Sequence, residues 1–450
     1  MKFAIGDDVG QLKIVIAPRG TDTSLKTSAR PRISTYFEPD RKDSVCAVCR
    51  IERYGGVERD GMVAAVFTSG AVKLVDTNVS PISGVEKYLL YSNSPSSTST
   101  VVSAGVRDGI IYLFHANAEV TFYRFDGEAP SIKTVALTGT IAAGAIFTQE
   151  LVNGWPSALA IGGEKRELEV FEQGAEGDWK SVWKGKNVKQ DKLGLEVPVY
   201  IRRILFLGTS GEAGTPTTAG HPRRQTVQTS SSRSYRLATG TYYSHLRIYD
   251  TAVSRRPVFT TCLTKSPILS LHLHPSSTSQ SSTALTQPNT PPESSTTTPP
   301  YNWVYTDSNG HFALYSSTTR REAGLYKGST GAVNATATFS KDIVAGVGFD
   351  RYLRVYGGSS REVVVKAYVK SKGTAVAVLD GEDEVVEVEM SKEEEEEEEV
   401  WGEMVEVVGE EGSSGEEGEG DFTEALVKVR RRRPRTDKEG GGSKKRRVEG

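Results

Sequence analysis

The sequence predicts an all-β protein, a closed seven-bladed β-propeller, because one strand pattern recurs seven times along the first 381 residues. The clearest copy runs from Leu237 to Pro257, LATGTYYSHLRIYDTAVSRRP, and it combines an apolar strand, a polar turn and a second strand that ends in Tyr-Asp. Apolar and polar residues alternate within the copies, which is the two-residue period of a β-strand. We therefore expect each copy to form the second and third strands of one blade.

The third strand of each blade is the most regular unit. It often ends in an acidic residue, where WD repeats carry a Trp-Asp dipeptide. The seven copies are LKIVI (12–16), VKLVD (72–76), VTFYRFD (120–126), LEVFE (168–172), LRIYD (246–250), FALYS (312–316) and LRVYG (353–357). Because no Trp-Asp dipeptide occurs, the repeat is WD-repeat-like and degenerate.

The innermost strands are predicted from apolar runs rich in small residues, which a crowded propeller axis requires. Six such runs precede a blade: SVCAVCRI, VVSAGVRD, GTIAAGAIF, VYIRRILFL, PILSLHLHP and AVNATATFS. The chain begins at the second strand of blade one, so that blade lacks an innermost strand at the N-terminal side. Residues 374–380, TAVAVLD, are expected to supply it and to close the ring without free sheet edges.

Two insertions, 208–234 and 276–300, interrupt the period between the innermost and second strands of their blades. The second is rich in Ser, Thr and Pro, and both are expected to be disordered. Equivalent connections of a propeller emerge on one face. The opposite face is therefore the better candidate for a partner surface.

The segment 382–450 is predicted to be a disordered, low-complexity tail that is acidic at first and basic at its end. It carries 24 acidic and 12 basic side chains, against 33 acidic and 43 basic ones in the preceding 381 residues. Two basic clusters have the arrangement of a bipartite nuclear localisation signal, although a basic tail could instead contact RNA. The candidate signal residues are Lys428, Arg430, Arg431, Arg432, Arg433, Arg435, Lys444, Lys445, Arg446 and Arg447.

The composition indicates a globular protein of a reducing compartment. The formal net charge of −2 hides a basic body, which is typical of proteins that meet a polyanion such as RNA. Three cysteines are too few for a disulfide framework. Neither a signal peptide nor an apolar run long enough to span a membrane is found, so no membrane association is expected.

No catalytic constellation can be recognised in the sequence, and we expect no enzyme activity, cofactor or metal. Cys46 and Cys49 have the spacing of half a zinc site, but no second Cys/His pair completes one, and both are expected to be small core residues. His272 and His274 lie two apart on one strand without a third ligand, so a structural role is favoured. A phosphate-binding loop followed by Lys-Ser/Thr is also missing.

Several stretches are more specific than a generic propeller. KGKNVKQDKLGLEVPVYIRRILFL (184–207), LATGTYYSHLRIYDTAVSRRPV, GTDTS (20–24) and FDRYLRVYG followed by AYVKSKG together resemble the Nop-seven-associated WD-repeat family. The resemblance spans all seven blades, and the acidic and basic tail is only loosely similar.

The resemblance implies a non-catalytic scaffold of ribosome biogenesis in the nucleus and nucleolus. Such a protein would bind precursors of the large (60S) ribosomal subunit, contact assembly factors and pre-rRNA, and be released by an AAA-type ATPase. A nuclear import receptor would read the tail. The alternative is a nuclear propeller adaptor that reads a peptide or a histone tail.

The connector from Lys186 to Pro198 is longer than a link between blades requires, and it carries alternating charges and leucines. It is expected either to bind a partner or to pack inward on Leu193 and Leu195. Asp350, in the turn before LRVYG, is expected to accept hydrogen bonds from that turn. The candidate partner-binding residues are Lys186, Asn187, Asp191, Arg202, Tyr243, His245 and Arg351.

Overall fold

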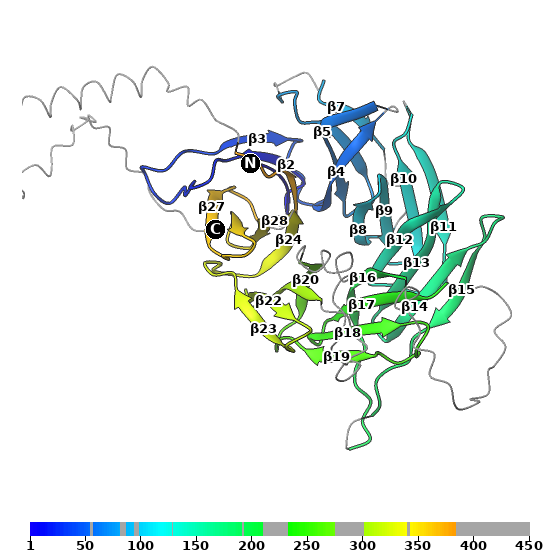
Figure 1. Cartoon of the computed structure of the whole chain (residues 1–450). Coiled ribbons are helices and arrows are strands. Elements are labelled where there is room, and N and C mark those ends of the chain that lie inside the picture. The colour runs from blue at the N-terminus through cyan, green and yellow to red at the C-terminus, as the bar shows by residue number, and fades with distance from the viewer. Residues whose placement is uncertain are drawn as a thin grey trace, which may run out of the picture. The chain divides into compact units, whose positions relative to one another are not determined.

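Seven four-stranded antiparallel sheets form the folded part of the chain in the computed structural model. The structure describes residues 1–54, 57–81, 87–93, 99–127, 129–190, 193–209, 233–274, 301–339 and 343–383. In Figure 1 the sheets are arranged as blades around a ring, and the last strand lies beside the first ones. The predicted seven-bladed propeller is confirmed. Within these ranges no helix has the length and apolar character needed to cross a membrane.

Each blade contributes its innermost strand to the propeller axis. These strands are β28 (Gly373–Asp380), β4 (Val45–Tyr54), β8 (Val101–Arg107), β12 (Ala143–Val152), β16 (Ile201–Thr209), β20 (Ile268–Leu273) and β24 (Val333–Phe339), in blades one to seven. The second strands are β1 (Lys2–Asp7), β5 (Val57–Phe67), β9 (Ile110–His115), β13 (Trp155–Gly163), β17 (Tyr235–Thr241), β21 (Asn302–Asp307) and β25 (Ile343–Gly348).

The third strands follow in the same blade order. They are β2 (Leu12–Ile16), β6 (Val72–Asp76), β10 (Glu119–Arg124), β14 (Arg166–Gln173), β18 (His245–Asp250), β22 (Phe312–Ser316) and β26 (Tyr352–Gly357). The outer strands are β3 (Arg32–Tyr36), β7 (Leu89–Ser92), β11 (Ser131–Ala136), β15 (Trp179–Lys184), β19 (Phe259–Cys262), β23 (Arg321–Leu325) and β27 (Val363–Tyr368).

The ring closes within blade one, where both ends of the folded chain meet. β28 pairs antiparallel with β1, which brings Phe3 opposite Val378 and Ile5 opposite Val376. The sheet order β28-β1-β2-β3 therefore combines the three N-terminal strands with the last strand of the folded chain. This pairing gives blade one its fourth strand and ties the two ends of the folded chain together.

Apolar side chains fill the spaces between neighbouring blades, and each of the seven buried clusters joins two adjacent sheets. The cluster between blades seven and one, for example, packs Val347 and Leu353 against Phe3 and Val376. Small residues let the innermost strands approach closely. A Cβ atom on Gly144 would lie 2.3 Å from the Phe114 ring of the preceding blade.

The sequence reading of single strands needs three corrections. The third strand of blade three ends at Arg124 rather than at residue 126, because Phe125 turns into the core and packs edge-on against Tyr91. The second strand of the same blade is β9, although its sequence IIYLFH does not show the alternation that marks the other second strands. The first insertion begins later than expected, because Gly208 and Thr209 still pair with β17. Residues 210–232, 275–300 and 384–450, on which the disorder predictions fall, lie outside the described residues.

Alternation of strand direction gives the propeller two faces. The turns between second and third strands and the links between blades emerge on one face, which we call the connector face. The turns between first and second strands and between third and fourth strands emerge on the opposite face. The end of β16 and the start of β17, and likewise the end of β20 and the start of β21, lie on that opposite face.

Candidate partner-binding site

The junction of blades four and five brings together most of the predicted partner-binding residues. Arg202 lies on β16, Tyr243 in the turn before β18, and His245 at the start of β18. Lys186 and Asn187 begin the segment from Gly185 to Tyr200 that links β15 to β16, which we call the connector. Asp191 lies outside the described residues.

Three tyrosines form an exposed cluster at this junction, which we call the tyrosine cluster (Tyr200, Tyr242 and Tyr243). The Tyr242 amide donates a 2.8 Å hydrogen bond to the Tyr200 carbonyl, which places the two side chains next to each other. Their rings stack at 5.3 Å between centroids, and the Tyr243 ring meets Tyr242 edge-on at 5.6 Å. Tyr242 and Tyr243 are each 42% exposed. The cluster therefore presents rigid aromatic surface to solvent.

Arg202 extends this surface with a planar cation. Its guanidinium lies 5.5 Å from the centre of the Tyr200 ring and donates a 3.3 Å hydrogen bond from Nη1 to the Tyr200 hydroxyl. Aromatic side chains and arginines that are already held in position lose little conformational entropy when a partner binds. Arg202 and the tyrosine cluster thus have the composition of an interface hot spot.

The base of the connector is fastened to blade five through its backbone. The Lys186 amide donates a 2.7 Å hydrogen bond to the Arg255 carbonyl, and Arg255 Nε donates to the Lys184 carbonyl at 2.6 Å. Asn187 holds the loop together, because its Nδ2 donates to the Val197 carbonyl at 2.6 Å. Its Oδ1 accepts the Val188 amide at 2.8 Å. Asn187 therefore uses its side-chain amide inside the protein rather than presenting it to a partner.

The tip of the connector is exposed rather than packed inward. Leu193 and Leu195 are 82% and 62% exposed, which is contrary to the inward-packing alternative considered from the sequence. The connector, which ends at Tyr200 of the tyrosine cluster, thus exposes two further large apolar side chains, and such exposed apolar surface often marks a binding site.

A buried arginine lies beneath the connector. Arg247, on β18, has no exposed surface, and its Nη1 donates to Asn187 Oδ1 at 3.2 Å. Its Nε and Nη2 atoms form no well-aligned hydrogen bond to any described residue, although the Tyr249 hydroxyl lies beside the guanidinium. Burial raises the pKa of nearby Glu167, and the Arg247 charge opposes that shift. Asn187 thus couples the position of the connector to a buried charge.

His245 should make stability depend on pH. Burial, and secondly the Arg247 charge, lower the pKa of His245 below its ordinary value of 6.5. As the pH falls below that value, the unfolded chain binds a proton at this ring before the folded chain does, so stability is lost. Between about pH 7.5 and pH 5.5, the free energy of unfolding should therefore fall less in His245→Gln than in the parent. Urea unfolding of both proteins at the two pH values measures this difference. Equal losses in the two proteins would contradict this role of His245.

Arg351 lies apart from the other candidates, in the turn between β25 and β26 of blade seven. Its backbone is left-handed, with φ at 63°, and its side chain is exposed. Phe349, two residues earlier in the chain, is 59% exposed, and Lys372 Nζ lies 4.6 Å from the centre of the Phe349 ring. Arg351 and Phe349 therefore form a separate exposed spot on the connector face.

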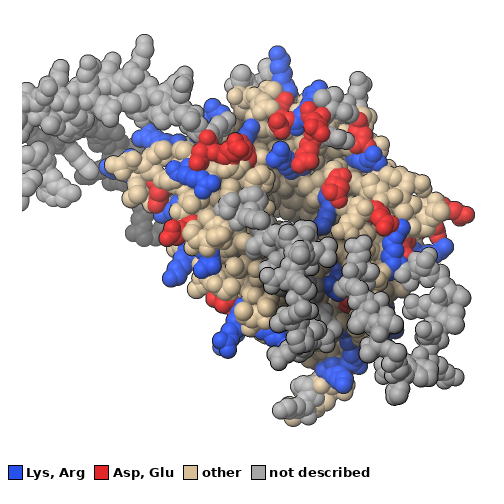
Figure 2. Space-filling view, in the orientation of Figure 1, with Lys and Arg blue, Asp and Glu red and all other residues tan. Residues whose placement is uncertain are grey.

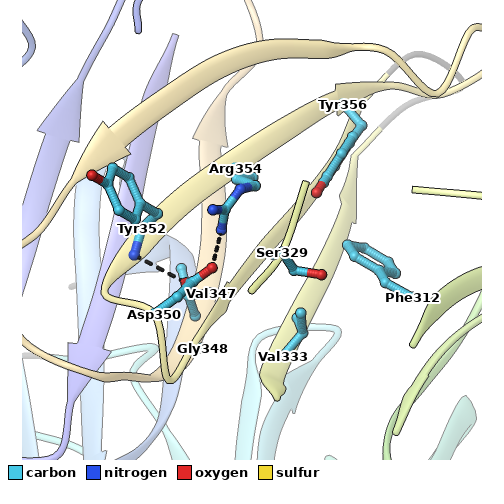
Figure 3. A pocket seen from close by; sticks show the side chains of 10 residues that line it. Phe312, Ser329, Val333, Val347, Gly348, Asp350, Tyr352, Arg354 and Tyr356 are labelled. Atoms are coloured by element: carbon cyan, nitrogen blue, oxygen red, sulfur yellow. Dashed lines mark hydrogen bonds and ion pairs between the residues drawn. The ribbon is translucent and has the colours of Figure 1, made fainter. Parts of the chain in front are cut away.

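Asp350 of the same turn acts as its internal anchor. Its Oδ1 accepts the Tyr352 amide at 3.3 Å, and its Oδ2 accepts the Thr330 amide at 3.2 Å. Figure 3 shows Arg354 pointing at the same carboxylate, with which it forms an ion pair. The expected hydrogen bonds to the turn are thus present. Blade one has an equivalent arrangement. Asp7 accepts hydrogen bonds from the Val9 and Gln11 amides and forms an ion pair with Lys13 at 3.1 Å.

The described residues offer no group of three His, Cys, Asp or Glu side chains that could hold a metal ion. Cys49 is buried in the core between blades two and three, and Cys46 packs against that core. Burial raises the pKa of both thiols to about 12, so they are protonated at neutral pH. Figure 2 shows acidic and basic side chains interspersed on the visible face rather than gathered into one large field.

Sequence reasoning missed several residues of this site. Tyr200 and Tyr242 are distant in the sequence, and they become neighbours only through the pairing of β16 with β17. Arg247 occupies the second position of the predicted strand LRIYD (246–250), where a solvated side chain is the simplest expectation. The run TYYS between two predicted strands was the available signal for the aromatic turn.

No protein-family model matches the sequence. Ribosome biogenesis protein nsa1 of Schizosaccharomyces pombe is 26% identical over 427 residues, which cover 90% of this chain and 96% of that protein. Ribosome biogenesis protein NSA1 of Yarrowia lipolytica is 24% identical over 400 residues, which cover 84% and 87%. Human WD repeat-containing protein 74 is 27% identical over 232 residues, which cover 51% and 47%.

These similarities support a relationship of the chain to the Nop-seven-associated WD-repeat family. The resemblance found in the sequence is thereby confirmed. Because the similarity to the fission yeast protein extends over 90% of the chain, it concerns the whole propeller rather than a single blade. Among solved structures, Saccharomyces cerevisiae Sqt1 is 12% identical and covers 74% of this chain and 77% of its own, with a TM-score of 0.45, which is too low to support a conclusion.

Proposed function

We propose that this chain, as a member of the Nop-seven-associated WD-repeat family, is a non-catalytic scaffold in ribosome biogenesis. It binds nucleolar precursors of the large (60S) ribosomal subunit and takes part in pre-rRNA processing and assembly. Relatives that match most of the chain carry the name ribosome biogenesis protein, which supports the proposal. The structural observation that carries it is the exposed tyrosine cluster with Arg202 and the connector leucines.

The partner is proposed to be an assembly factor within the precursor particle, docked on the connector face at blades four and five. Exposed aromatic rings and leucines suit a protein partner, and Arg202 can reach a carboxylate or a phosphate. Pre-rRNA is proposed as a second contact of the basic body. Release by an AAA-type ATPase is implied by the family and forms part of the same proposal.

Sedimentation tests the proposal directly. The tagged chain in a nuclear extract should sediment with large-subunit precursors in a sucrose gradient, and the bound fraction should fall when the salt concentration rises from about 0.1 to 0.5 M, because charged contacts are screened. Migration of the chain as a free protein at low salt would contradict the proposal.

The second candidate is a nuclear adaptor that reads a peptide or histone tail in the channel. Among the described residues, the channel lining includes Arg50, Arg107 and Arg203 and no Asp or Glu. A basic histone tail would be repelled there, because like charges in a partly desolvated site cost free energy. The lining therefore favours the scaffold over a histone reader.

The basic end of the tail is proposed to direct nuclear import through an import receptor, and hence nuclear and nucleolar localisation. These residues lie outside the described ones. Truncation before Glu424 should leave a tagged protein largely cytoplasmic with an unchanged melting temperature, because Lys428–Arg435 and Lys444–Arg447 supply the charge that a receptor reads. A matched control replaces the run Glu393–Glu399 with Gln and should stay nuclear. Nuclear retention of the truncated protein would contradict this role.

A further inference from the structure

A channel runs along the propeller axis, lined by the innermost strands. Its volume is about 570 Å³, within the range of ligand-binding pockets. All seven innermost strands line it, mostly with Ala, Val, Gly, Ser and Thr. Its walls therefore belong to every blade and are separate from the tyrosine cluster at the junction of blades four and five.

The charged side chains that line the channel are all positive. Arg50, Arg107 and Arg203 line the channel, and none of the lining residues that the structure describes is Asp or Glu. Arg50 is partly satisfied, because it donates to the Leu379 carbonyl at 2.8 Å and lies 3.6 Å from Asp60. Arg107 and Arg203 have no ion pair with any described carboxylate. The channel thus carries positive charge that the described residues do not neutralise.

Arg203 is held within the wall by its own backbone. Its Nη1 donates a 3.0 Å hydrogen bond to the Arg202 carbonyl. Burial, and secondly the charge of Arg202, lower the pKa of Arg203 to about 10, so it is still protonated at neutral pH. A partly buried cation whose hydrogen-bond partner is a single carbonyl retains donors for an anion.

The neutral polar groups of the wall divide into two kinds. The hydroxyls tie neighbouring blades together: Ser103 donates to the Gly144 carbonyl at 2.9 Å, and Ser270 and Thr336 share a 2.6 Å hydrogen bond. His272 and Tyr112 stay neutral at pH 7, because burial lowers the pKa of His272 to about 4 and raises that of Tyr112 to about 12. The arginines are therefore the groups left to recognise a ligand.

The charges are spread along the channel. All innermost strands run in the same direction, from the connector face to the opposite face. Arg203 is near the start of β16, whereas Arg107 is the last residue of β8. Tyr112 lies close enough to both for their charges to affect its pKa. An extended peptide advances about 3.3 Å per residue, so a segment of six or seven residues spans such strands and can offer carboxylates to both arginines.

We propose that the axial channel binds an extended acidic peptide segment of a partner protein, with Arg107 and Arg203 binding its carboxylates. Single-stranded RNA is disfavoured, because bases bind by stacking on exposed aromatic rings, and the aromatic residues of the lining are Tyr112 and Phe206, of which Phe206 is 4% exposed. This site is independent of the proposed docking on precursor particles, which uses the tyrosine cluster.

Fluorescence anisotropy of the full chain tests the channel. The probe is a fluorescein-labelled eight-residue peptide of alternating Glu and Ala, and the matched peptide has Gln in place of Glu. The Glu peptide should bind and the Gln peptide should not. Arg203→Gln and Arg107→Gln should each weaken binding at least about tenfold, because each removes a charge-assisted hydrogen bond. Arg203→Lys should weaken it less.

Arg321→Gln serves as the matched control, because Arg321 is exposed on the outer strand β23, away from the axis. It should bind the Glu peptide as the parent does, and melting temperatures verify that all variants fold. Failure of the parent to bind, or binding that the channel variants leave unchanged, would overturn the proposal. So would binding of an oligouridine of equal charge with the same dependence on Arg107 and Arg203.

Discussion

Asp350→Ala is expected to lower the free energy of unfolding by about 3–5 kcal/mol, because it leaves Arg354 as a buried charge without its partner. The side chains of Asp350 and Arg354 are 9% and 7% exposed. The substitution also removes the acceptor of the Tyr352 and Thr330 amides. Hydrogen bonds alone would give a loss of about 1.5–3 kcal/mol. Urea unfolding at neutral pH measures the difference.

Two further variants separate the ion pair from a general sensitivity of the propeller. Asp350→Ala combined with Arg354→Leu should recover most of the lost stability, because an apolar pair replaces the unpaired charge. Asp60→Ala removes a carboxylate whose side chain is 99% exposed and should change stability little. Hydrogen exchange in Asp350→Ala should be faster in blade seven and at its closure with blade one. A double variant as unstable as the single one would show that the ion pair is not the cause.

Replacing Arg202, Tyr242 and Tyr243 together with Ala should weaken association with large-subunit precursors at least about tenfold. Hot-spot residues of this composition contribute about 2 kcal/mol or more each when they are buried by a partner. All three lie at the surface of blade five, so the melting temperature should change by only a few degrees. The bound fraction in a sucrose gradient is the measurement.

Tyr368→Ala is the matched control for the tyrosine cluster. Tyr368 is 39% exposed and contacts the Tyr352 ring at 5.2 Å, but it lies on the outer strand of blade seven. It should sediment with precursors like the parent. Equal association of the triple variant and the parent would remove the tyrosine cluster from the interface. Asn187 is unsuitable for this test, because its loss would also disturb the connector and Arg247.

Much of the fold could be predicted from the sequence, because strand periodicity and repetition are local signals. The seven third strands recur with similar apolar patterns, and the missing innermost strand of blade one identified TAVAVLD as the closing segment. β9 escaped recognition because IIYLFH has a continuous apolar run rather than clear alternation.

The candidate site was only partly predictable, because its contacts depend on register and burial. The sequence identified the connector, but it did not show that Asn187 faces Arg247 while Leu193 and Leu195 face solvent. The ion pair of Asp350 with Arg354 requires both side chains to lie on the same side of a turn. The uncompensated charge of the axial channel likewise follows from side chains on several different strands.

Affinity purification of the tagged full-length chain, followed by sequencing of the bound RNA, tests the central claim most directly. A scaffold of large-subunit assembly should enrich precursors of the large-subunit rRNA over those of the small subunit, together with large-subunit assembly factors. The triple variant of Arg202, Tyr242 and Tyr243 should lose that enrichment. Recovery of no ribosomal precursor, or of small-subunit precursors alone, would contradict the account.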